Sequence, residues 1–576
     1  NFFNFKYIFK VPFVYLIHLI VLIIFSIKTF ISFKMAFIDM NEGQKGTRRW
    51  ATEEEIKEQY ISINEYPYDE NNRLRKYKGM GGYPVARIDN QLYINQSMLP
   101  MLLIGATGSG KGQCYMFQTI DSFSRSEEQP SMVIPDPKLE SYASTGEELK
   151  KRGYKVLLLN LIDTTQSMGY NPLSIITKYY LNGDIDKAQE QAKIIAFSLY
   201  GNNKEKSSDP YWNEQAETYC TALILAHTED CCNSGHPEKN IMYSLAQTHN
   251  FLNAKMTDDE EESYLDIYFE HRNDNSTAKA LYMAGFKQTP DKTKQTIFST
   301  VTKELNVFLM QSIAKLTSYS SVEFDEFGFG DNPVALFIGF EESNKANNKL
   351  ISMFIDQLYI QLSRAALLKS SDGKCKRSVR FILDEFLNFP AIQNIEGKLT
   401  LARGKNIQFI LVIQSFSQID LLYNEKITKI IKDNIATQIY ILTNGIETAD
   451  YFSKLIGNYT YDEVTRSGSI FATNELMQLH MGESVVSRTD PRRTLEGKDC
   501  IPYPIRNIGD NRFKYAFSYL DCFNKKDYQH LTDIDNSKIN LESLKFKAIE
   551  YVEMIIKIKD VIDINKFENE IIDIFK

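Results

Sequence analysis

A glycine-rich loop between an apolar strand and a helix is the feature that most constrains this chain. The segment GATGSGKG, at Gly105–Gly112, follows the apolar run Met101–Ile104 and opens a helix that runs to about Ser124. Glycines let backbone N–H groups wrap a phosphate, the helix N-terminus adds its dipole, and a lysine reaches the β- and γ-oxygens. The loop therefore predicts a nucleotide-phosphate site. Its candidate residues are Gly105, Ala106, Thr107, Gly108, Ser109, Gly110, Lys111, Gly112 and Gln113.

A strand that ends in two carboxylates is the expected partner of this loop. The run FILDE, at Phe381–Glu385, is apolar until its last two residues. In P-loop ATPases the first carboxylate here positions Mg²⁺ and the second polarises the attacking water. The loop template has Ser or Thr after its lysine as a metal ligand, whereas this chain has Gly112. We therefore expect Asp384 to carry more of the Mg²⁺ positioning, directly or through water, and Glu385 to polarise the attacking water for ATP hydrolysis.

Polar residues also end two further apolar runs, FILVIQ at Gln414 and QIYILTN at Thr443 and Asn444. The carboxyl ends of parallel strands meet at one edge of a sheet. Gln414 is thus a candidate catalytic sensor of the γ-phosphate or of water, and strand-end capping is the alternative for all three residues. Arg403, near the end of a predicted helix, is a candidate arginine finger acting across a subunit boundary, or else a solvated helix-end arginine.

Hydrophobic periodicity predicts an α/β fold, in which a parallel sheet is interrupted by an all-α insertion. Short apolar runs alternate with helical patterns up to about Leu159, give way to long amphipathic helices, and return at Ala335–Phe340. The expected divisions are a membrane segment (1–34), a linker leading into the motor (35–95), the first part of the nucleotide-binding domain (96–171), the all-α insertion (172–332), its second part (333–525) and a tail (526–576).

The charge balance limits how this chain contacts nucleic acid. Sixty-six Lys and Arg against 74 Asp and Glu give a net charge of −8, which excludes a globally basic nucleic-acid binder. The candidate DNA surfaces are local, at Lys287–Lys303 and Arg488–Arg493, and both are also typical of solvated faces. Seven cysteines include Cys231 and Cys232 near His236, but no second ligand pair matches them, so a zinc site is not expected.

The amino-terminal segment predicts a membrane helix at about residues 11–27. The run VPFVYLIHLIVLIIFSI carries no formal charge and has aromatic residues near its edge. His18, in mid-span, is expected to be a tolerated polar residue. Met35 opens a polar segment and is an alternative start.

Several motifs in a fixed order resemble the TraG/TraD-type coupling proteins of conjugative type IV secretion. The likeness covers roughly residues 45–460. It includes TRRWATEEEIK, GATGSGKG, VIPDPKLESY, YNPLS, DPYWNEQAETYCTALIL, NPVALFIGF, FILDEFLNFPAIQNIEGKLTLARGKNIQFILVIQSFSQI and TNGIETADYFSKLIG. The GKG ending of the loop is also common in this family.

The resemblance implies a RecA-like P-loop motor, anchored in the cell membrane with its ATPase body in the cytoplasm, that works as a homo-hexamer. Lys111 would be the Walker A lysine, Asp384 and Glu385 the Walker B pair, and Asp136 and Lys138 part of a DPK signature. The implied partners are single-stranded DNA with a bound relaxase and the type IV secretion channel subunits. Family members usually carry two membrane helices before the motor, whereas one is visible here.

Three functions remain open at this point. The first is an ATP-driven coupling protein for conjugative DNA transfer. The second is a double-stranded DNA translocase of the chromosome-segregation type, which would carry a C-terminal DNA-orienting module. The third is a docking scaffold locked in one nucleotide state, for which Gly112 is the argument and the Asp384–Glu385 pair the counter-argument.

Overall fold

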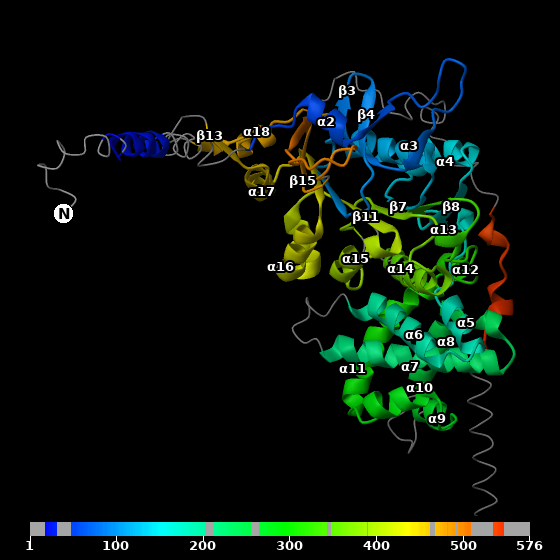
Figure 1. The fold of residues 1–576 in the computed structure, drawn as a ribbon. Helices are drawn as coiled ribbons and strands as arrows, with labels where there is room; N and C mark the ends of the chain where they lie inside the picture. Colours follow the sequence, from blue (N-terminus) through cyan, green and yellow to red (C-terminus); the bar gives the residue numbers. More distant parts are fainter. Residues whose placement is uncertain are drawn as a thin grey trace, which may run out of the picture.

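The structure is a computed structural model that describes residues 16, 18–30, 48–201, 211–254, 264–341, 347–388, 390–460, 467–480, 482–490, 492–507 and 534–546. Its centre is a nine-stranded sheet with the order β16-β15-β12-β5-β11-β10-β7-β9-β8 (Figure 1). The strands are β5 (Met101–Gly105), β7 (Ser131–Asp136), β8 (Lys155–Asn160), β9 (Val334–Gly339), β10 (Val379–Leu383), β11 (Ile407–Ile413), β12 (Thr437–Leu442), β15 (Ser484–Arg488) and β16 (Ile505–Asn507).

The strand order brings the glycine-rich loop and the carboxylate pair to the same edge. From β12 to β8 all neighbouring strands are parallel, while β15 and β16 are antiparallel to their neighbours. One strand, β11, separates β5 from β10, with Ile413 opposite Ile104 and Leu411 opposite Leu383. The carboxyl ends of these three strands are therefore almost level, which confirms the predicted α/β class with a largely parallel sheet.

Both faces of the sheet are buried, which explains why its strands read as unbroken apolar runs. Successive side chains of a strand point to opposite faces. In β5, Leu102 and Ile104 join the cluster on the face of the long helices, and Met101 and Leu103 join the cluster on the other face.

The second face is covered by α3 (Phe117–Arg125), α4 (Glu140–Lys151) and a small antiparallel sheet (Figure 1). That sheet has the strand order β1-β4-β3. The helix α2 precedes β1 along the chain, and Thr52 and Glu55 form a reciprocal capping box at its first turn. The region expected as a linker and entry to the motor domain, 35–95, thus contains a folded layer over its described part. The elements are α2 (Glu53–Gln59), β1 (Ile61–Asn64), β3 (Tyr83–Ile88) and β4 (Gln91–Asn95); two shorter pairs are β2 (Tyr77–Met80) with β6 (Ser126–Glu128), and β13 (Asn458–Thr460) with β14 (Ser467–Ser469).

The first face is covered by long helices, below which lies a helical body (Figure 1). Between β8 and β9 the described residues form helices and no strand. The sheet-covering helices are α14 (Lys349–Lys369), α15 (Ile395–Leu401), α16 (Phe416–Asn434) and α17 (Ile446–Ile456), with α18 (Thr473–Leu476) beside α17. The helical body contains α5 (Ser174–Leu181), α6 (Ile185–Tyr200), α7 (Tyr211–Asn233), α8 (Met242–Ala254), α9 (Tyr264–Glu270), α10 (Thr277–Leu281), α11 (Asp291–Leu305), α12 (Gln311–Leu316) and α13 (Glu326–Phe329).

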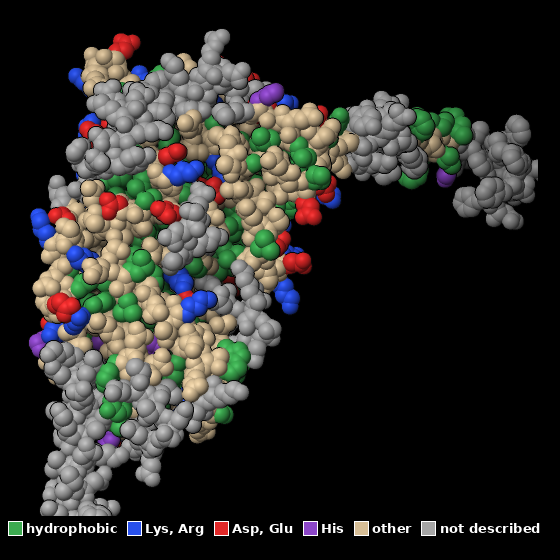
Figure 2. All heavy atoms as spheres, turned by 180° about the vertical axis from the view of Figure 1, so that it is seen from behind, with side chains coloured by type: hydrophobic (Ala, Val, Ile, Leu, Met, Phe, Trp, Pro, Cys, Tyr) green, Lys and Arg blue, Asp and Glu red, His purple; other side chains and the backbone are tan. Residues whose placement is uncertain are grey.

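The two ends of the chain contribute one described segment each. Near the carboxyl end, residues 534–546 lie along the helical body, and the Asn536 side chain donates to the carbonyls of Thr164 and Ser167 at 2.9 Å (Figure 1). Near the amino end, residues 18–30 are helical with exposed apolar side chains (Figure 2). The membrane helix predicted at 11–27 lies partly outside the described residues, as does Met35. Over the described ranges, no helix combines the length and the apolar character that crossing a bilayer requires.

Candidate functional site

The glycine-rich loop folds tightly around its own backbone. Gly108 and Gly110 have φ values of +81° and +88°, which only glycine adopts freely. The Ala106 amide donates to the Leu442 carbonyl of β12 at 2.6 Å, and this bond fixes the start of the loop. The following helix begins as a π-helical turn, Gly112–Met116, which is a rare form that is frequent at functional sites.

Lys111, Glu385 and Gln414 meet at the carboxyl edge of the sheet. Lys111 Nζ lies 3.2 Å from Glu385 Oε1, and Gln414 Nε2 donates to Glu385 Oε2 at 2.9 Å. Only 9% of the Lys111 side chain and 17% of the Glu385 side chain are exposed. Both oxygens of one carboxylate are therefore engaged by the loop lysine and by the end of the neighbouring strand β11.

Glu385 occupies a backbone conformation that is uncommon for its residue type. Its φ is +47°, and its amide donates to Oδ1 of the preceding residue, Asp384, at 2.9 Å. A non-glycine residue in this region is held there by its surroundings. The strained turn directs the two carboxylates of the DE pair differently: Glu385 toward Lys111, and Asp384 back to the backbone.

The DPK signature has a structural explanation that the sequence did not supply. Asp136 ends β7, and its Oδ2 accepts from the Tyr142 amide in the first turn of α4 at 2.8 Å. Burial raises the pKa of Asp136 to about 7; the backbone N–H bonds oppose this shift, and the charge of Asp384 adds to it. Lys138, with φ +119°, is exposed. Asp136 is therefore a third carboxyl group close to the site, which sequence reasoning had named without a role.

The remaining strand-end candidates differ in their surroundings. Thr443 is 2% exposed, donates to the Gln414 carbonyl at 3.3 Å and accepts from the Gly445 amide at 3.2 Å. It therefore caps the end of β12 and fixes the backbone of Gln414. Asn444 is exposed.

Magnesium fits the oxygen-rich edge of this site. Mg²⁺ is usually held by one or two carboxylates, substrate phosphates and several waters rather than by a complete protein cage. Asp384 supplies a carboxylate here, and the buried Ser109 Oγ in the loop has no hydrogen-bond partner among protein atoms. Within the described residues, no group of three or more His, Cys, Asp or Glu side chains is placed to hold a metal ion by itself.

Arg403 lies away from the nucleotide edge of its own chain. It is exposed in a 3₁₀ turn, Ala402–Lys405, which immediately precedes the amino end of β11. Because β11 and β5 are parallel, this turn lies at the edge of the sheet opposite the glycine-rich loop. Arg403 therefore does not contact Lys111 of the same chain, and its role as a finger stays a prediction about a neighbouring subunit.

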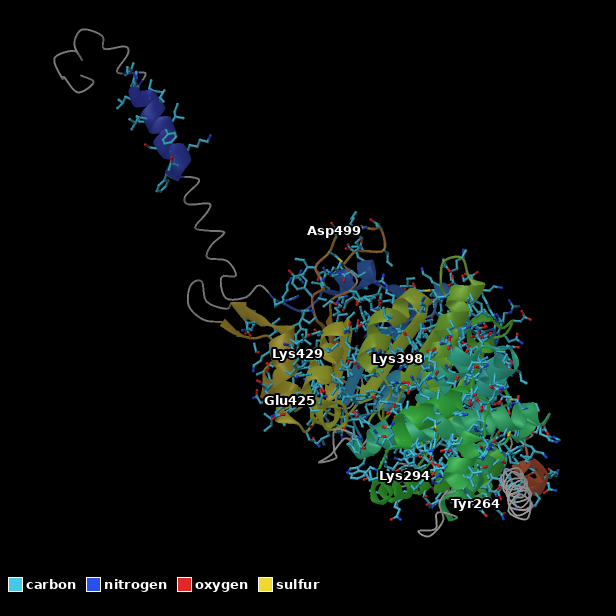
Figure 3. All side chains as sticks on the ribbon, turned by 90° about the horizontal axis from the view of Figure 1, so that it is seen from below. Tyr264, Lys294, Lys398, Glu425, Lys429 and Asp499 are labelled. Atoms are coloured by element: carbon cyan, nitrogen blue, oxygen red, sulfur yellow. The ribbon has the colours of Figure 1, made fainter. Side chains whose placement is uncertain are left out.

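The two candidate DNA surfaces are not uniformly basic faces. Lys294 is 7% exposed and Arg488 is 4% exposed, with the Arg488 Nε donating to the Tyr503 carbonyl at 2.8 Å. Arg493 pairs with Asp499. Figure 3 labels Lys294 and Asp499, which lie on opposite sides of the main body in that view. Neither stretch forms a continuous basic patch over its described residues.

The site combines a glycine-rich phosphate-binding loop, the lysine of that loop, and carboxylates at the end of a nearby strand of a parallel sheet. This combination defines the P-loop class of nucleotide-binding fold. Within that class, residues 49–488 match the family described as Type IV secretory system Conjugative DNA transfer. The protein belongs to this family, which confirms the resemblance seen in the sequence.

Individual relatives agree with this assignment. The chain is 24% identical over 390 residues to the conjugal transfer protein TraG of Escherichia coli, covering 64% of this chain and 57% of TraG. It is 33% identical over 114 residues to protein VirD4 of Rhizobium rhizogenes, covering 20% of this chain and 17% of VirD4. The matches thus span a little over half of TraG and a small part of VirD4.

Solved structures share the fold. The plasmid coupling protein TrwB in complex with the non-hydrolysable ATP analogue ADPNP has a TM-score of 0.52 and 15% identity, covering 72% of this chain and 86% of TrwB. TrwB in complex with ADP and Mg²⁺ has a TM-score of 0.51 and 16% identity, with the same coverage. At these identities the likeness shows an α/β fold with a large, mostly parallel sheet.

Proposed function

We propose that this protein is the ATP-hydrolysing coupling protein of a conjugative type IV secretion system. The observation that carries the proposal is the meeting of Lys111, Glu385 and Gln414 at the mouth of the glycine-rich loop. Family membership supports the role in conjugative DNA transfer, and the nucleotide complexes of TrwB support ATP and Mg²⁺ as ligands.

Nucleotide binding exchanges the partner of Lys111. The ammonium group now faces one carboxylate oxygen at 3.2 Å in a largely buried place. The β- and γ-phosphates carry more negative charge than Glu385, so they draw Lys111 away from it. Glu385 then keeps its bond to Gln414 and has one oxygen free to accept a proton from the attacking water.

Asp384 would position Mg²⁺, directly or through water, and would carry more of this role because Gly112 offers no side-chain ligand. When bound, Mg²⁺ neutralises developing charge on the phosphate oxygens. Gln414 keeps the Glu385 carboxylate oriented, and Thr443 fixes the backbone of Gln414. The site therefore separates a phosphate-binding group, Lys111, from a proton-accepting group, Glu385.

The rest of the proposal concerns the assembly. A homo-hexamer would bring Arg403, at the opposite edge of the sheet, toward the nucleotide of a neighbouring subunit. The substrate is single-stranded DNA with a bound relaxase, and the receiving partners are the type IV secretion channel subunits. The exposed apolar side chains of residues 18–30 support attachment to the cell membrane, with the ATPase body on the cytoplasmic side.

Steady-state ATP hydrolysis, with and without single-stranded DNA, tests the proposal. Lys111→Ala should lose nucleotide affinity, while Glu385→Gln should keep it and lose about 100-fold or more in kcat. Lys429→Ala and Glu425→Gln, at exposed positions on α16 (Figure 3), are the matched controls and should hydrolyse ATP as the wild type does.

Two results would contradict this reading. ATP binding without turnover under every condition, including with DNA, would favour the docking scaffold. Stimulation by duplex but not by single-stranded DNA would favour the double-stranded DNA translocase.

A further inference from the structure

The loop that follows Glu385 is held by a row of polar side chains on α14. Asn348 precedes the first residue of this helix, and Ser352 and Asp356 follow at intervals of four residues. Residues with this spacing share one face of a helix. Their exposed fractions are 1%, 0% and 0%. We call these three residues the α14 ladder.

Each member of the ladder bonds to the backbone of the loop. Asn348 Nδ2 donates to the Asn388 carbonyl at 3.1 Å, and Ser352 Oγ donates to the Pro390 carbonyl at 2.6 Å. The Gln393 amide donates to Asp356 Oδ2 at 3.2 Å. The ladder thus holds the loop at three successive points between Asn388 and Gln393.

The ladder connects to Glu385 through one further hydrogen bond. The Asn388 amide donates to the Glu385 carbonyl at 2.8 Å, while the Asn388 carbonyl accepts from Asn348. Glu385 itself has the strained φ of +47°. A strained residue stays in place only when its surroundings over-determine it, and the turn closed by the Asn388 amide is one such restraint.

Simple core packing does not account for these polar side chains. The ladder is interleaved with fully buried apolar residues such as Ile351, Met353 and Ile355. A buried polar group without a partner is destabilising, so apolar residues fit such positions unless a neighbouring backbone group needs a hydrogen-bond partner. Here the partners are loop carbonyls and an amide, which must be satisfied wherever they are buried.

Asp356 also anchors the helix that follows the loop. Its Oδ1 lies 3.0 Å from the Nζ of Lys398 on α15, a side chain that is 6% exposed (Lys398 is labelled in Figure 3). The loop is therefore held at both ends, by Leu383 in β10 at its start and by the Asp356–Lys398 ion pair at its end.

We propose that Asn348, Ser352 and Asp356 are positioning residues for Glu385, holding the loop that sets its carboxylate against the nucleotide edge. The inference rests on the proposed ATP hydrolysis, because Glu385 is the proton acceptor in that reaction. The bonds that these three side chains make to the loop reach the backbone of Asn388, Pro390 and Gln393, and none of these bonds reaches Lys111 or the glycine-rich loop. Their loss should therefore lower kcat and leave nucleotide affinity unchanged.

Ser352→Ala is the most conservative test, because it removes one hydroxyl group. We expect kcat to fall about tenfold from misplacement of the carboxylate, with nucleotide Kd and melting temperature close to wild type. Ser352→Thr, which restores a hydroxyl, should recover most of the rate. Ser363→Ala is the matched control, since Ser363 lies on α14 about three turns beyond Ser352.

Asn348→Asp is a second variant that keeps the side-chain shape. It places a carboxylate oxygen against the Asn388 carbonyl, so it should disturb the turn even if Ser352→Ala is too mild. Amide hydrogen exchange of Asn388, whose N–H bonds to Glu385, reports on the loop without any need for turnover. Exchange should be faster in both ladder variants than in wild type and unchanged in Ser363→Ala.

The two readouts separate this inference from the proposed function. If wild type hydrolyses ATP and both ladder variants match it in kcat, the inference is wrong. It is equally wrong if the Ser363→Ala control loses as much activity, or if Kd rises in step with the loss of kcat. If wild type does not hydrolyse ATP, the proposed function fails, and unchanged Asn388 exchange in the variants would then overturn the ladder independently.

Discussion

Replacing Asp136 by Asn should change how the stability of this protein depends on pH. Asp136 ends β7 with 4% of its surface exposed, and its pKa is raised to about 7 chiefly by burial. The amides of Tyr142 and Ser141 favour the charged form, whereas the charges of Asp384 and Glu140 oppose it. Asn keeps an oxygen that can accept from the Tyr142 amide, so the variant removes the titrating carboxyl group and keeps the hydrogen bond to the first turn of α4.

The sign and size follow from the two pKa values. An unfolded Asp has a pKa of about 3.9. Because the folded value is higher, the stabilising contribution of the protonated group is complete below pH 4 and is lost as the pH rises through about 7. Over the two pH units from 5 to 7, the slope of 1.36 kcal/mol per unit gives a loss of about 3 kcal/mol. Asp136→Asn should therefore gain about 3 kcal/mol relative to wild type between pH 5 and pH 8.

Thermal denaturation of both proteins at pH 5, 6, 7 and 8 measures this difference. A chain of 576 residues is not a two-state system, so the readout is the difference between the two apparent melting temperatures. We expect this difference to move by about 2–3 °C in favour of the variant. Asp163→Asn, at an exposed position after β8, controls for simple loss of charge. A difference that stays constant from pH 5 to pH 8 would refute a buried, titrating Asp136.

Two further predictions concern the loop and the tail. Gly105→Ala places a Cβ 2.6 Å from Ser109 Oγ and 3.0 Å from Lys111 Cγ, so nucleotide affinity should fall at least about tenfold in a titration with a fluorescent ATP analogue. Gly404→Ala, which meets nothing within 4 Å, should bind normally, and equal affinity in both variants would contradict the packing argument. Asn536→Ala removes two buried hydrogen bonds to the turn after β8, worth about 1–3 kcal/mol, so limited proteolysis should cut near residues 534–546 faster than in wild type. An unchanged cleavage rate would show that this segment is held by other contacts.

The proximity of Lys111, Glu385 and Gln414 could be predicted from the sequence because one rule of sheet geometry covers all three. Each follows an apolar run, and the carboxyl ends of parallel strands share an edge. The structure places the three side chains within hydrogen-bonding distance. Their catalytic roles remain predictions.

Features that depend on contacts distant in sequence could not be predicted. Glu385 has a positive φ, but no glycine at that position indicates a left-handed conformation in the sequence. Asn348 bonds to the carbonyl of a residue forty positions away. The small sheet formed by β1, β3 and β4 consists of short strands with little periodicity, so the sequence indicated a linker and entry to the motor domain there without predicting this sheet. In each case the deciding interaction joins segments that local pattern cannot relate.

Charge runs were the least informative part of the sequence. A run of lysines or arginines in the sequence does not show which of these side chains are exposed, because their burial depends on the fold. Lys294 and Arg488 read as members of basic stretches, yet both are buried. Arg403 shows the converse: the sequence placed it close to Glu385 along the chain, and the parallel sheet then carried it to the opposite edge.

The position of α14 explains how the helical body and the nucleotide edge are mechanically related. One residue after Asp356, the fully buried Gln357 accepts from the Tyr170 hydroxyl at 2.7 Å and donates to the Pro172 carbonyl at 3.0 Å, where the helical body begins. Adjacent residues of α14 therefore bond to two different segments: Asp356 to the loop after Glu385, and Gln357 to the start of the helical body. Since both belong to one continuous hydrophobic core with the sheet, the helical body cannot shift against the sheet without either breaking the Gln357 bonds or moving α14. A movement of α14 would reach Glu385 through the ladder.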